Sequence, residues 1–325
     1  MIATNNGSYP LGGTERGAEL EEALVRFGRG EIAADDLRLL QDRATRQALD
    51  EQARAGIDLP TDGLVRRLDP VRPLASGLTG MAVGETRQEL PGSGGRYSLP
   101  LVISEISWSR PILVEDFLFA SRGLAGTVKP VLLGPFTLAH LAEDRAYGDP
   151  PTLATALASA LNQELRALQS AGAAFIQIDE PALLARRDDY PIFTRVWEIL
   201  GRGITATLSL HLEGAAVDGL YPGIARLKRL GCLSLDCVRG LESLHRLNAA
   251  ALPDTLRVGL GVVDGRSAAI ESPEAIVELV RGAPGLPPKD RILLGTASDL
   301  GGLPSAAAAA KLAVLSQAAR ILNRG

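Results

Sequence analysis

Residues 174–183, AFIQIDEPAL, join a short apolar run to two carboxylates, Asp179 and Glu180, and then to Pro181. Such a run is typical of a strand buried in a parallel sheet, and the proline forces the chain into a new element. Two carboxylates at the end of a buried strand are costly to remove from water unless they bind something. The stretch therefore predicts a buried strand with functional residues at its carboxyl end.

The same pattern continues on both sides of this stretch. Apolar runs that suit buried strands occupy residues 1–4, 57–59, 128–133, 174–178, 205–210, 232–235, 256–263 and 291–294. Windows that suit helices occupy residues 17–29, 34–55, 151–171, 192–200, 215–230, 240–250, 273–281 and 305–322. Eight strands that alternate with helices predict a TIM (β/α)8 barrel, in which the chemistry takes place where the strands end.

An open, doubly wound sheet is the main alternative, because it also alternates strands with helices. Such a sheet ordinarily has a glycine-rich phosphate-binding turn after its first strand. The turn here reads Asn5-Asn6-Gly7-Ser8, which is not G-x-G-x-x-G, and the chain has no G-x-x-x-x-G-K-[ST] motif. The sequence favours the barrel and gives nucleotide binding no support.

At 325 residues the chain has room for about two average domains or for one barrel. Prolines and glycines interrupt the periodicity at residues 68–98, which predicts an irregular excursion or a hairpin rather than a linker between domains. We therefore expect residues 1–325 to form a single barrel with this one excursion.

The composition excludes several classes of protein. With 46% hydrophobic residues the chain can bury a large core, so it is not disordered. Its 34 basic and 38 acidic residues give a net charge of −4 without runs of like charge, so a nucleic acid is not an expected partner. The apolar runs are far shorter than the ~18 residues of a membrane span. Two cysteines, Cys232 and Cys237, and a start without a signal segment favour the cytoplasm.

Acidic residues and a histidine follow most of the expected strands, and a barrel brings all strand ends to one rim. They are Asp62, Asp179, Glu180, His211, Glu213, Asp236, Asp264 and Asp299. For Asp62 and Asp264 we expect helix capping or turn formation, because aspartate is common at such positions. The remaining residues are the candidates for chemistry.

His211 and Glu213 are two residues apart on an extended segment, so their side chains point to the same side. With Asp236, after the next strand, they form a set of side chains that can bind a divalent metal. A metal with an open coordination position would act as a Lewis acid. The alternative is that His211 only forms hydrogen bonds within the rim.

Residues 128–140, VKPVLLGPFTLAH, and residues 177–183, QIDEPAL, make the sequence recognisable. Together they resemble the carboxy-terminal catalytic barrel of cobalamin-independent methionine synthase. Residues 6–10, NGSYP, are similar to the family's I-G-S-F-P, and residues 259–267, GLGVVDGRS, are similar to its G-x-G-V-x-D-x-H-S. The resemblance implies a TIM barrel of the UROD/methionine-synthase-like type, here as a single-barrel relative of a family that also has two-barrel members.

The family moves a methyl group to the thiol of homocysteine, which zinc holds as a thiolate. Its methyl donor is methyl-folate, whereas some single-barrel relatives take the methyl group from a corrinoid protein. The resemblance therefore implies a small amino-acid-like substrate and a methyl-folate or methyl-corrinoid donor. In the second case a corrinoid protein is an expected partner.

The zinc ligands of the family are a His-x-Cys pair, a glutamate one strand later and a cysteine after the last strand. His211 matches the histidine, Glu213 stands at the first cysteine, and Asp236 stands at the glutamate. The last cysteine is replaced by Leu300. Because His, Glu and Asp are harder ligands than thiolates, iron and manganese join zinc as candidate metals.

The substrate-binding positions are partly kept. Asp179 matches the carboxylate that holds the amino group of homocysteine, Ser8 matches a contact to the amino acid, and Arg87 keeps a position associated with the folate. Arg266 replaces a proton-donating histidine; its guanidinium stays charged, so we expect it to bind an anionic part of the substrate. The substrate-binding glutamate, the pterin-stacking tryptophan and a folate-binding acidic residue are replaced by Leu64, Leu141 and Ala185.

These features favour a metal-assisted, methionine-synthase-like methyltransferase of methionine biosynthesis that acts on homocysteine or a related acceptor. Two alternatives stay open. One is a repurposed metal-dependent enzyme of specialised metabolism, since histidine with carboxylates suits non-haem iron. The other is a non-catalytic barrel that binds an amino acid.

Overall fold

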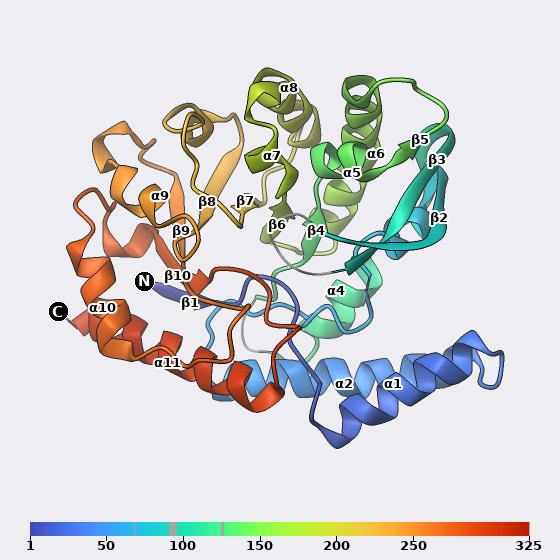
Figure 1. Cartoon of the computed structure of the whole chain (residues 1–325), viewed down its shortest axis with the longest axis horizontal. Helices are drawn as coiled ribbons and strands as arrows, with labels where there is room; N and C mark the ends of the chain where they lie inside the picture. The colour runs from blue at the N-terminus through green and yellow to red at the C-terminus, as the bar shows by residue number, and fades with distance from the viewer. Residues whose placement is uncertain (68, 91–95, 125–126, 325) are drawn as a thin grey trace.

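A computed structural model of the chain describes residues 1–67, 69–90, 96–124 and 127–324 (Figure 1). Its main sheet is parallel, with seven strands in the order β1-β10-β9-β8-β7-β6-β4. These strands are β1 (Ile2–Thr4), β4 (Val131–Leu133), β6 (Phe175–Asp179), β7 (Thr207–Leu212), β8 (Leu230–Asp236), β9 (Arg257–Val263) and β10 (Ile292–Thr296). The curled parallel sheet with helices outside it confirms the predicted TIM-barrel class.

The strand expected at residues 57–59 is not formed. The segment contacts β1 through a single bridge at Leu59. The carboxylate of Asp58 takes one N–H of β1 at 2.8 Å, and Pro60 has no N–H with which to extend a ladder. The segment still closes the circle, because the carbonyl of Pro60 accepts the N–H of Lys129, just before β4, at 2.9 Å.

Most of the expected helices are present and surround the sheet. The longer ones are α1 (Glu15–Gly28), α2 (Ala34–Arg54), α6 (Pro150–Ser170), α8 (Tyr190–Leu200), α10 (Pro273–Gly282) and α11 (Ser305–Arg324). The structure adds four short helices where none was expected, α3 (Arg72–Gly77), α4 (Val114–Ser121), α5 (Pro135–Leu141) and α7 (Ala182–Ala185), and forms α9 (Leu241–Arg246) within an expected window. Of the window at residues 240–250, α9 covers the first part, and a 3-10 turn at Ala249–Ala251 follows it.

The prediction of a helix at residues 215–230 is wrong. The described chain there forms turns and a short 3-10 segment, Gly223–Arg226. Gly219 has a φ of +79°, a left-handed conformation that ends a helix, and Pro222 cannot donate the hydrogen bond that a helix needs. The apolar spacing of this window therefore produces buried turns rather than a helix.

The region at residues 68–98, where we expected an excursion or a hairpin, holds α3 and two long antiparallel strands, β2 (Leu78–Glu89) and β3 (Arg96–Trp108). Residues 68 and 91–95 lie outside the described residues. The short strand β5 (Glu143–Asp144) pairs with β3. Figure 1 shows this small sheet at the right of the barrel, next to α5 and α6.

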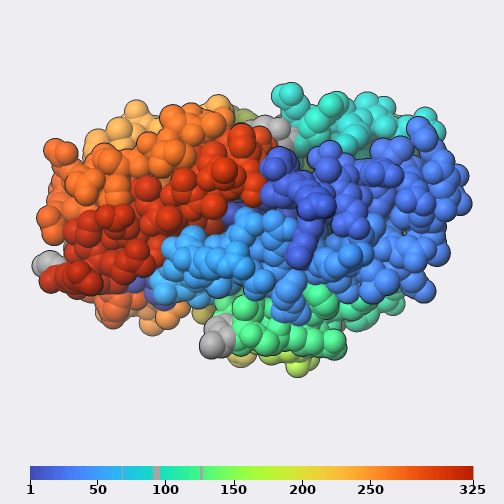
Figure 2. All heavy atoms as spheres, turned by 90° about the horizontal axis from the view of Figure 1, so that it is seen from below, coloured from blue at the N-terminus to red at the C-terminus, as the bar shows by residue number. Residues whose placement is uncertain are grey.

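The two ends of the chain meet on one side of the barrel. Seen from below, α11 (red) and α2 (light blue) lie side by side (Figure 2). The ammonium group of Met1 donates a hydrogen bond to the side chain of Asn323 at 2.6 Å.

Within the described part of the chain, no helix combines the length and the apolar character that crossing a membrane requires.

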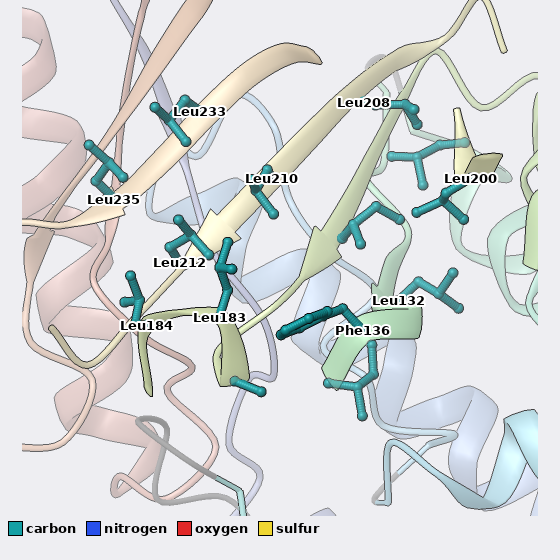
Figure 3. Close-up of a cluster of buried hydrophobic side chains, with 14 of the residues drawn as sticks. Leu132, Phe136, Leu183, Leu184, Leu200, Leu208, Leu210, Leu212, Leu233 and Leu235 are labelled. Atoms are coloured by element: carbon teal, nitrogen blue, oxygen red, sulfur yellow. The ribbon is translucent and has the colours of Figure 1, made fainter. Parts of the chain in front are cut away.

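Alternation along β7 decides which of its side chains face the barrel axis. Leu210 and Leu212 point toward the outer layer, where Leu183 of α7 lies beside them (Figure 3). Because neighbouring side chains on a strand point to opposite faces, Ser209 and His211 face the interior of the barrel. The packing of the leucines on the outer face thus orients the side chain of His211 toward the interior of the barrel.

Candidate active site

A pocket of about 690 Å³ opens where the strands of the barrel end. Its polar lining residues include Asn6, Ser8, Asp179, His211, Glu213, Arg266 and Asp299. Leucines of α1 and of the loops line another part of it, together with Arg87, Arg96 and Arg239. The four predicted substrate-binding residues thus share one pocket with two of the predicted metal ligands.

His211 reaches the pocket with one ring nitrogen bonded and the other buried. Its Nδ1 lies 3.0 Å from the hydroxyl of Ser234 on β8. Its Nε2 has no hydrogen-bond partner among the described residues. Burial, with the positive charges of Lys129 and Arg266, lowers the pKa of His211 to about 3. The imidazole is therefore neutral, and its Nε2 is available to a ligand.

Glu213 follows β7 and brings a buried carboxylate to the same pocket. Its Oε2 makes no hydrogen bond to the described residues and lies 3.6 Å from a guanidinium nitrogen of Arg266. Burial raises the pKa of Glu213 well above its usual range, and the carboxylates of Asp179 and Asp299 add to this rise. Glu213 therefore lies close to other carboxylates, and its own carboxyl group keeps its proton to a higher pH than a free glutamate does.

Asp236, at the end of β8, is 1% exposed and engages both of its oxygens within the protein. Its Oδ1 accepts the N–H groups of Val238 at 2.9 Å and Arg239 at 2.8 Å. Its Oδ2 accepts the N–H of Gly214 at 3.0 Å and a guanidinium N–H of Arg266 at 3.0 Å. A carboxylate offers about four lone-pair sites, so these donors give Asp236 the role of holding the loops after β7 and β8.

Arg266, after β9, lies among three carboxylates. Its guanidinium is 3.0 Å from Asp236, 3.6 Å from Glu213 and 3.5 Å from Asp264, and its side chain is 12% exposed. Asp264 also accepts the backbone N–H of Arg266 at 3.0 Å, which confirms its expected role in a turn. These surroundings suit a cation that is part of the protein. They disfavour our expectation that Arg266 binds an anionic part of the substrate.

The expected metal site of His211, Glu213 and Asp236 is not assembled. Across residues 1–67, 69–90, 96–124 and 127–324, no group of three or more His, Cys, Asp or Glu side chains could hold a metal ion. In addition, the oxygens of Asp236 are engaged by four N–H donors, one of them from Arg266. The residues present do not fit the zinc site that the resemblance implies.

Asp179 ends β6 and lines the pocket in a different setting. Its Oδ1 accepts a hydrogen bond from the amide of Gln177 at 2.7 Å. Burial raises the pKa of Asp179 to about 7, although the bond from Gln177 and the charge of Lys129 lower it. A buried carboxylate bonded to a neutral amide gains from a positive charge brought by a ligand.

Glu180, the second carboxylate of the opening stretch, is structural. Its oxygens accept the N–H groups of Phe136 at 3.1 Å and Thr137 at 2.7 Å, in the first turn of α5. Gly134 makes this possible, since a Cβ there would lie 2.1 Å from Oε1 of Glu180. Glu180 thus joins the loop after β4 to the end of β6, and what it binds is the protein's own backbone.

Ser8, after β1, faces Asp299 across the rim. Its hydroxyl donates to Oδ1 of Asp299 at 2.7 Å. Gly7 has a φ of +113°, and a Cβ on it would lie 2.8 Å from the Cβ of Asp299, so only glycine allows this approach. Asp299 is a pocket residue to which the strand-end pattern gave no particular role.

Lys129 lies behind the pocket, bonded to the pocket residue Asn6, and the sequence analysis missed it. It is 1% exposed, and its ammonium donates to Oδ1 of Asn6 at 2.7 Å. Burial lowers the pKa of Lys129 to about 7. The side-chain amide of Asn6 in turn donates to the hydroxyl of Ser234, the partner of His211, at 3.4 Å. A lysine inside the apolar run at residues 128–133 was the signal that could have revealed it.

Arg87 lies on β2, outside the barrel. It is exposed, and its guanidinium is 3.4 Å from the backbone carbonyl of Arg96 on the paired strand. Both arginines line the pocket on the side of the hairpin. The predicted substrate-binding residues therefore divide into a group at the strand ends and one arginine on the hairpin.

Sequence and structure comparisons identify the relatives of this chain. The catalytic domain of the cobalamin-independent synthases matches residues 1–321. The chain belongs to this family. A methionine synthase of Saccharolobus solfataricus is 30% identical over 277 residues, which cover 85% of this chain and 80% of the relative. A methionine synthase of Sulfurisphaera tokodaii is 29% identical over 278 residues, with coverages of 83% and 77%.

Two solved structures share the fold of this cobalamin-independent synthase domain. A B12-independent methionine synthase from Shewanella sp. W3-18-1, in complex with selenomethionine, superimposes with a TM-score of 0.80 at 21% identity, covering 99% of this chain and 97% of the other. A putative B12-independent methionine synthase from Listeria monocytogenes gives 0.74 at 16% identity and 99% of both chains. The resemblance inferred from the motifs is confirmed, and it places the chain in a methyltransferase family.

Proposed function

We propose that this member of the family transfers a methyl group to the sulfur of an amino-acid-like acceptor, homocysteine or a close relative. The observation that carries the proposal is the partly buried carboxylate of Asp179, which lines the pocket, accepts a hydrogen bond from the neutral amide of Gln177 and has a pKa raised to about 7. Such a group gains most from a cationic partner, and the α-ammonium group of an amino acid is one. The relatives are named methionine synthases, and the Shewanella structure is a complex with selenomethionine.

The side chain of the acceptor would extend from Asp179 toward the neighbouring strand. Asp179 pairs in register with His211, so the two residues end adjacent strands. The buried Nε2 of His211 and Oε2 of Glu213 lack hydrogen-bond partners among the described residues. Buried polar atoms are ordinarily satisfied, so we assign these two atoms to the reacting end of the acceptor. Ser8 is assigned to the amino-acid end.

The donor would enter from the side of the pocket that carries the leucines, Arg87 and Arg96. Among the described residues that line the pocket, Tyr9 is the only Phe, Tyr or Trp, and its hydroxyl is bonded to Glu51 at 2.8 Å. Aromatic pairs contribute about 0.5–1.5 kcal/mol beyond the area they bury. A pocket with one ring thus gives a flat pterin little stacking, so both methyl-folate and methyl-corrinoid, the latter with a corrinoid protein as partner, are donors to test.

Calorimetry with matched ligands tests the acceptor. L-Homocysteine is compared with 4-mercaptobutyrate, which has the same thiol and carboxylate and lacks the amine. We expect the wild type to bind homocysteine at least tenfold more tightly, and Asp179→Asn to lose this preference. Equal affinity of the wild type for both ligands would refute the assignment of Asp179.

Methyl transfer is then followed by mass spectrometry of methionine formed from homocysteine, with methyl-folate and with a methyl-corrinoid protein in separate reactions. Product with either donor supports the proposal and identifies the donor. Tight amino-acid binding without product from either donor would favour a non-catalytic amino-acid-binding barrel. Stoichiometric iron in the purified protein would favour the repurposed metal-dependent enzyme.

A further inference from the structure

A group of buried and partly buried charges beside the pocket joins the loops that follow β7, β8 and β9. It consists of one guanidinium, Arg266, and the carboxylates of Glu213, Asp236 and Asp264, at 3.6, 3.0 and 3.5 Å. The side chains of Glu213 and Asp236 are 7% and 0% exposed, and that of Arg266 is 12% exposed. We call this group the carboxylate cluster.

We propose that the guanidinium of Arg266 is the permanent cation of the carboxylate cluster and occupies the place of the divalent metal that the family implies. Buried carboxylates are costly unless a positive charge and hydrogen bonds compensate them. A guanidinium supplies both, and it stays charged at every accessible pH. The chain itself therefore supplies the cluster with a positive charge, closest to the carboxylate of Asp236.

The hydrogen bonds of Asp236 support this assignment independently of charge. Its Oδ2 is shared between Arg266 and the N–H of Gly214, and its Oδ1 is held by two N–H groups of the next turn. A metal ion bound to Asp236 would have to break at least one of these bonds. It would also have to sit beside a cation that cannot lose its charge.

The loop that carries Arg266 is anchored to the scaffold. The N–H of Asp264 donates to Oε1 of Glu271 at 2.9 Å, and the fully buried ammonium of Lys311 on α11 holds both oxygens of Glu271 at 2.8 and 2.9 Å. A Cβ on Gly265 would lie 2.0 Å from the carbonyl oxygen of Asp299, so the loop packs closely against the end of the barrel. Arg266 is thus preorganised by folding, which reduces the entropy lost when it makes its ion pairs.

Zinc binding tests this inference without relying on methyl transfer. Zn²⁺ is titrated into the chelator-treated wild type, Arg266→Ala, Arg239→Ala and the double variant Arg266→Ala/His211→Ala. Arg239 is the matched control, since it is an exposed arginine that lines the same pocket. We expect Arg266→Ala to gain one site for Zn²⁺ at least tenfold tighter than any site of the wild type or of Arg239→Ala. The double variant should lose this gain.

The gain is expected because removal of Arg266 takes away one of the two described hydrogen bonds to Oδ2 of Asp236, beside a pocket in which Nε2 of His211 and Oε2 of Glu213 lack hydrogen-bond partners among the described residues. A folded Arg266→Ala that binds Zn²⁺ no more tightly than the wild type would overturn the proposal. Wild type purified without chelator that carries one equivalent of zinc, iron or manganese, lost in His211→Ala, would also overturn it.

If Arg266→Ala does not fold, Arg266→Lys replaces it in the same titration, since lysine keeps the positive charge. We expect Arg266→Lys to exclude Zn²⁺ as the wild type does. One tight Zn²⁺ site in folded Arg266→Lys, absent from Arg266→Lys/His211→Ala, would show that a retained cation does not fill the cluster.

Discussion

Asp179 and Asp236 close two strands of one sheet, β6 and β8, with β7 between them, and their surroundings are opposite. Asp236 receives three backbone N–H groups and the guanidinium of Arg266. Asp179 receives the neutral amide of Gln177, and its pKa is raised to about 7. One carboxylate is satisfied by the chain, whereas the other gains by binding a cation from outside. The number and charge of the internal donors distinguish a structural aspartate from a binding aspartate on the same rim.

The largest effect should come from Asp236→Ala, which removes the carboxylate 3.0 Å from Arg266 and leaves three backbone N–H groups without their acceptor. Removing one partner of a buried ion pair costs about 3–5 kcal/mol, and we expect a loss of that size in the free energy of unfolding, measured by urea denaturation. Asp179→Asn is the matched control and should be no less stable than the wild type. Similar destabilisation by the two substitutions would show that Asp179 and Asp236 do not differ as structural and binding aspartates.

Asp179→Asn should instead weaken the binding of the acceptor. Losing a charge-assisted hydrogen bond costs about 1.5–3 kcal/mol, which corresponds to a roughly 10- to 150-fold higher Kd for homocysteine by calorimetry. The Kd for 4-mercaptobutyrate should change little, because that ligand has no ammonium group. Parallel loss of affinity for both ligands would show that Asp179 shapes the pocket rather than binds the amine.

The pH dependence of binding should follow the raised pKa of Asp179. The group is protonated below about pH 7 and ionised above it, and only the carboxylate attracts an ammonium group. Homocysteine affinity should therefore rise by up to about tenfold between pH 6 and pH 8 and level off above pH 8, as measured by calorimetry in matched buffers. Asp179→Asn should flatten this profile; an unchanged profile would assign the titration to another group.

The same shift has a consequence for folding, with a definite sign. A carboxyl group whose pKa is higher in the folded protein contributes stability that is full below its unfolded pKa of about 3.9 and is lost as the pH rises through about 7. Asp179→Asn should therefore gain stability relative to the wild type as the pH rises from 4 to 8. A stability difference that does not change with pH would contradict the burial of the charge.

The smallest effect concerns the cysteine that follows Asp236. Burial raises the pKa of Cys237 to about 12, and its thiol contacts a backbone carbonyl. Cys232 is also buried. Because the thiolate is the reactive form, neither cysteine should react with a thiol reagent in the native protein, and both should react after unfolding. Rapid native labelling of Cys237 would make it a candidate ligand or nucleophile on the side of Asp236.

The sequence predicted what depends on local periodicity. The strand within residues 174–183 ends at Asp179 as expected, and alternation on β7 turns His211 inward. Periodicity failed where special backbone chemistry intervenes. Pro60 prevents a strand at residues 57–59, and Gly219 with Pro222 prevents a helix at residues 215–230.

The candidate site could be predicted as a location and not as a set of partners. Ser8, Asp179 and Arg266 line the pocket because strand ends meet at one rim. That Asp236 is saturated depends on backbone N–H groups of the two loops after β7 and β8 and on the Arg266 side chain of a third loop, which no spacing in the sequence reveals. The same holds for Lys129, because its hydrogen-bond partner, Asn6, lies near the N-terminus of the chain.

The incomplete closure between β1 and β4 gives the barrel a seam. Across it, a single bridge at Leu59 and the bond from Lys129 to Pro60 replace the ladders that join the other strands. Regions with few ordered backbone bonds open locally at lower free energy than ladder-bonded ones. In hydrogen exchange, the amides of Leu59 and Lys129 should therefore exchange before those of β7 and β8. Local opening of the native barrel should begin between β1 and β4.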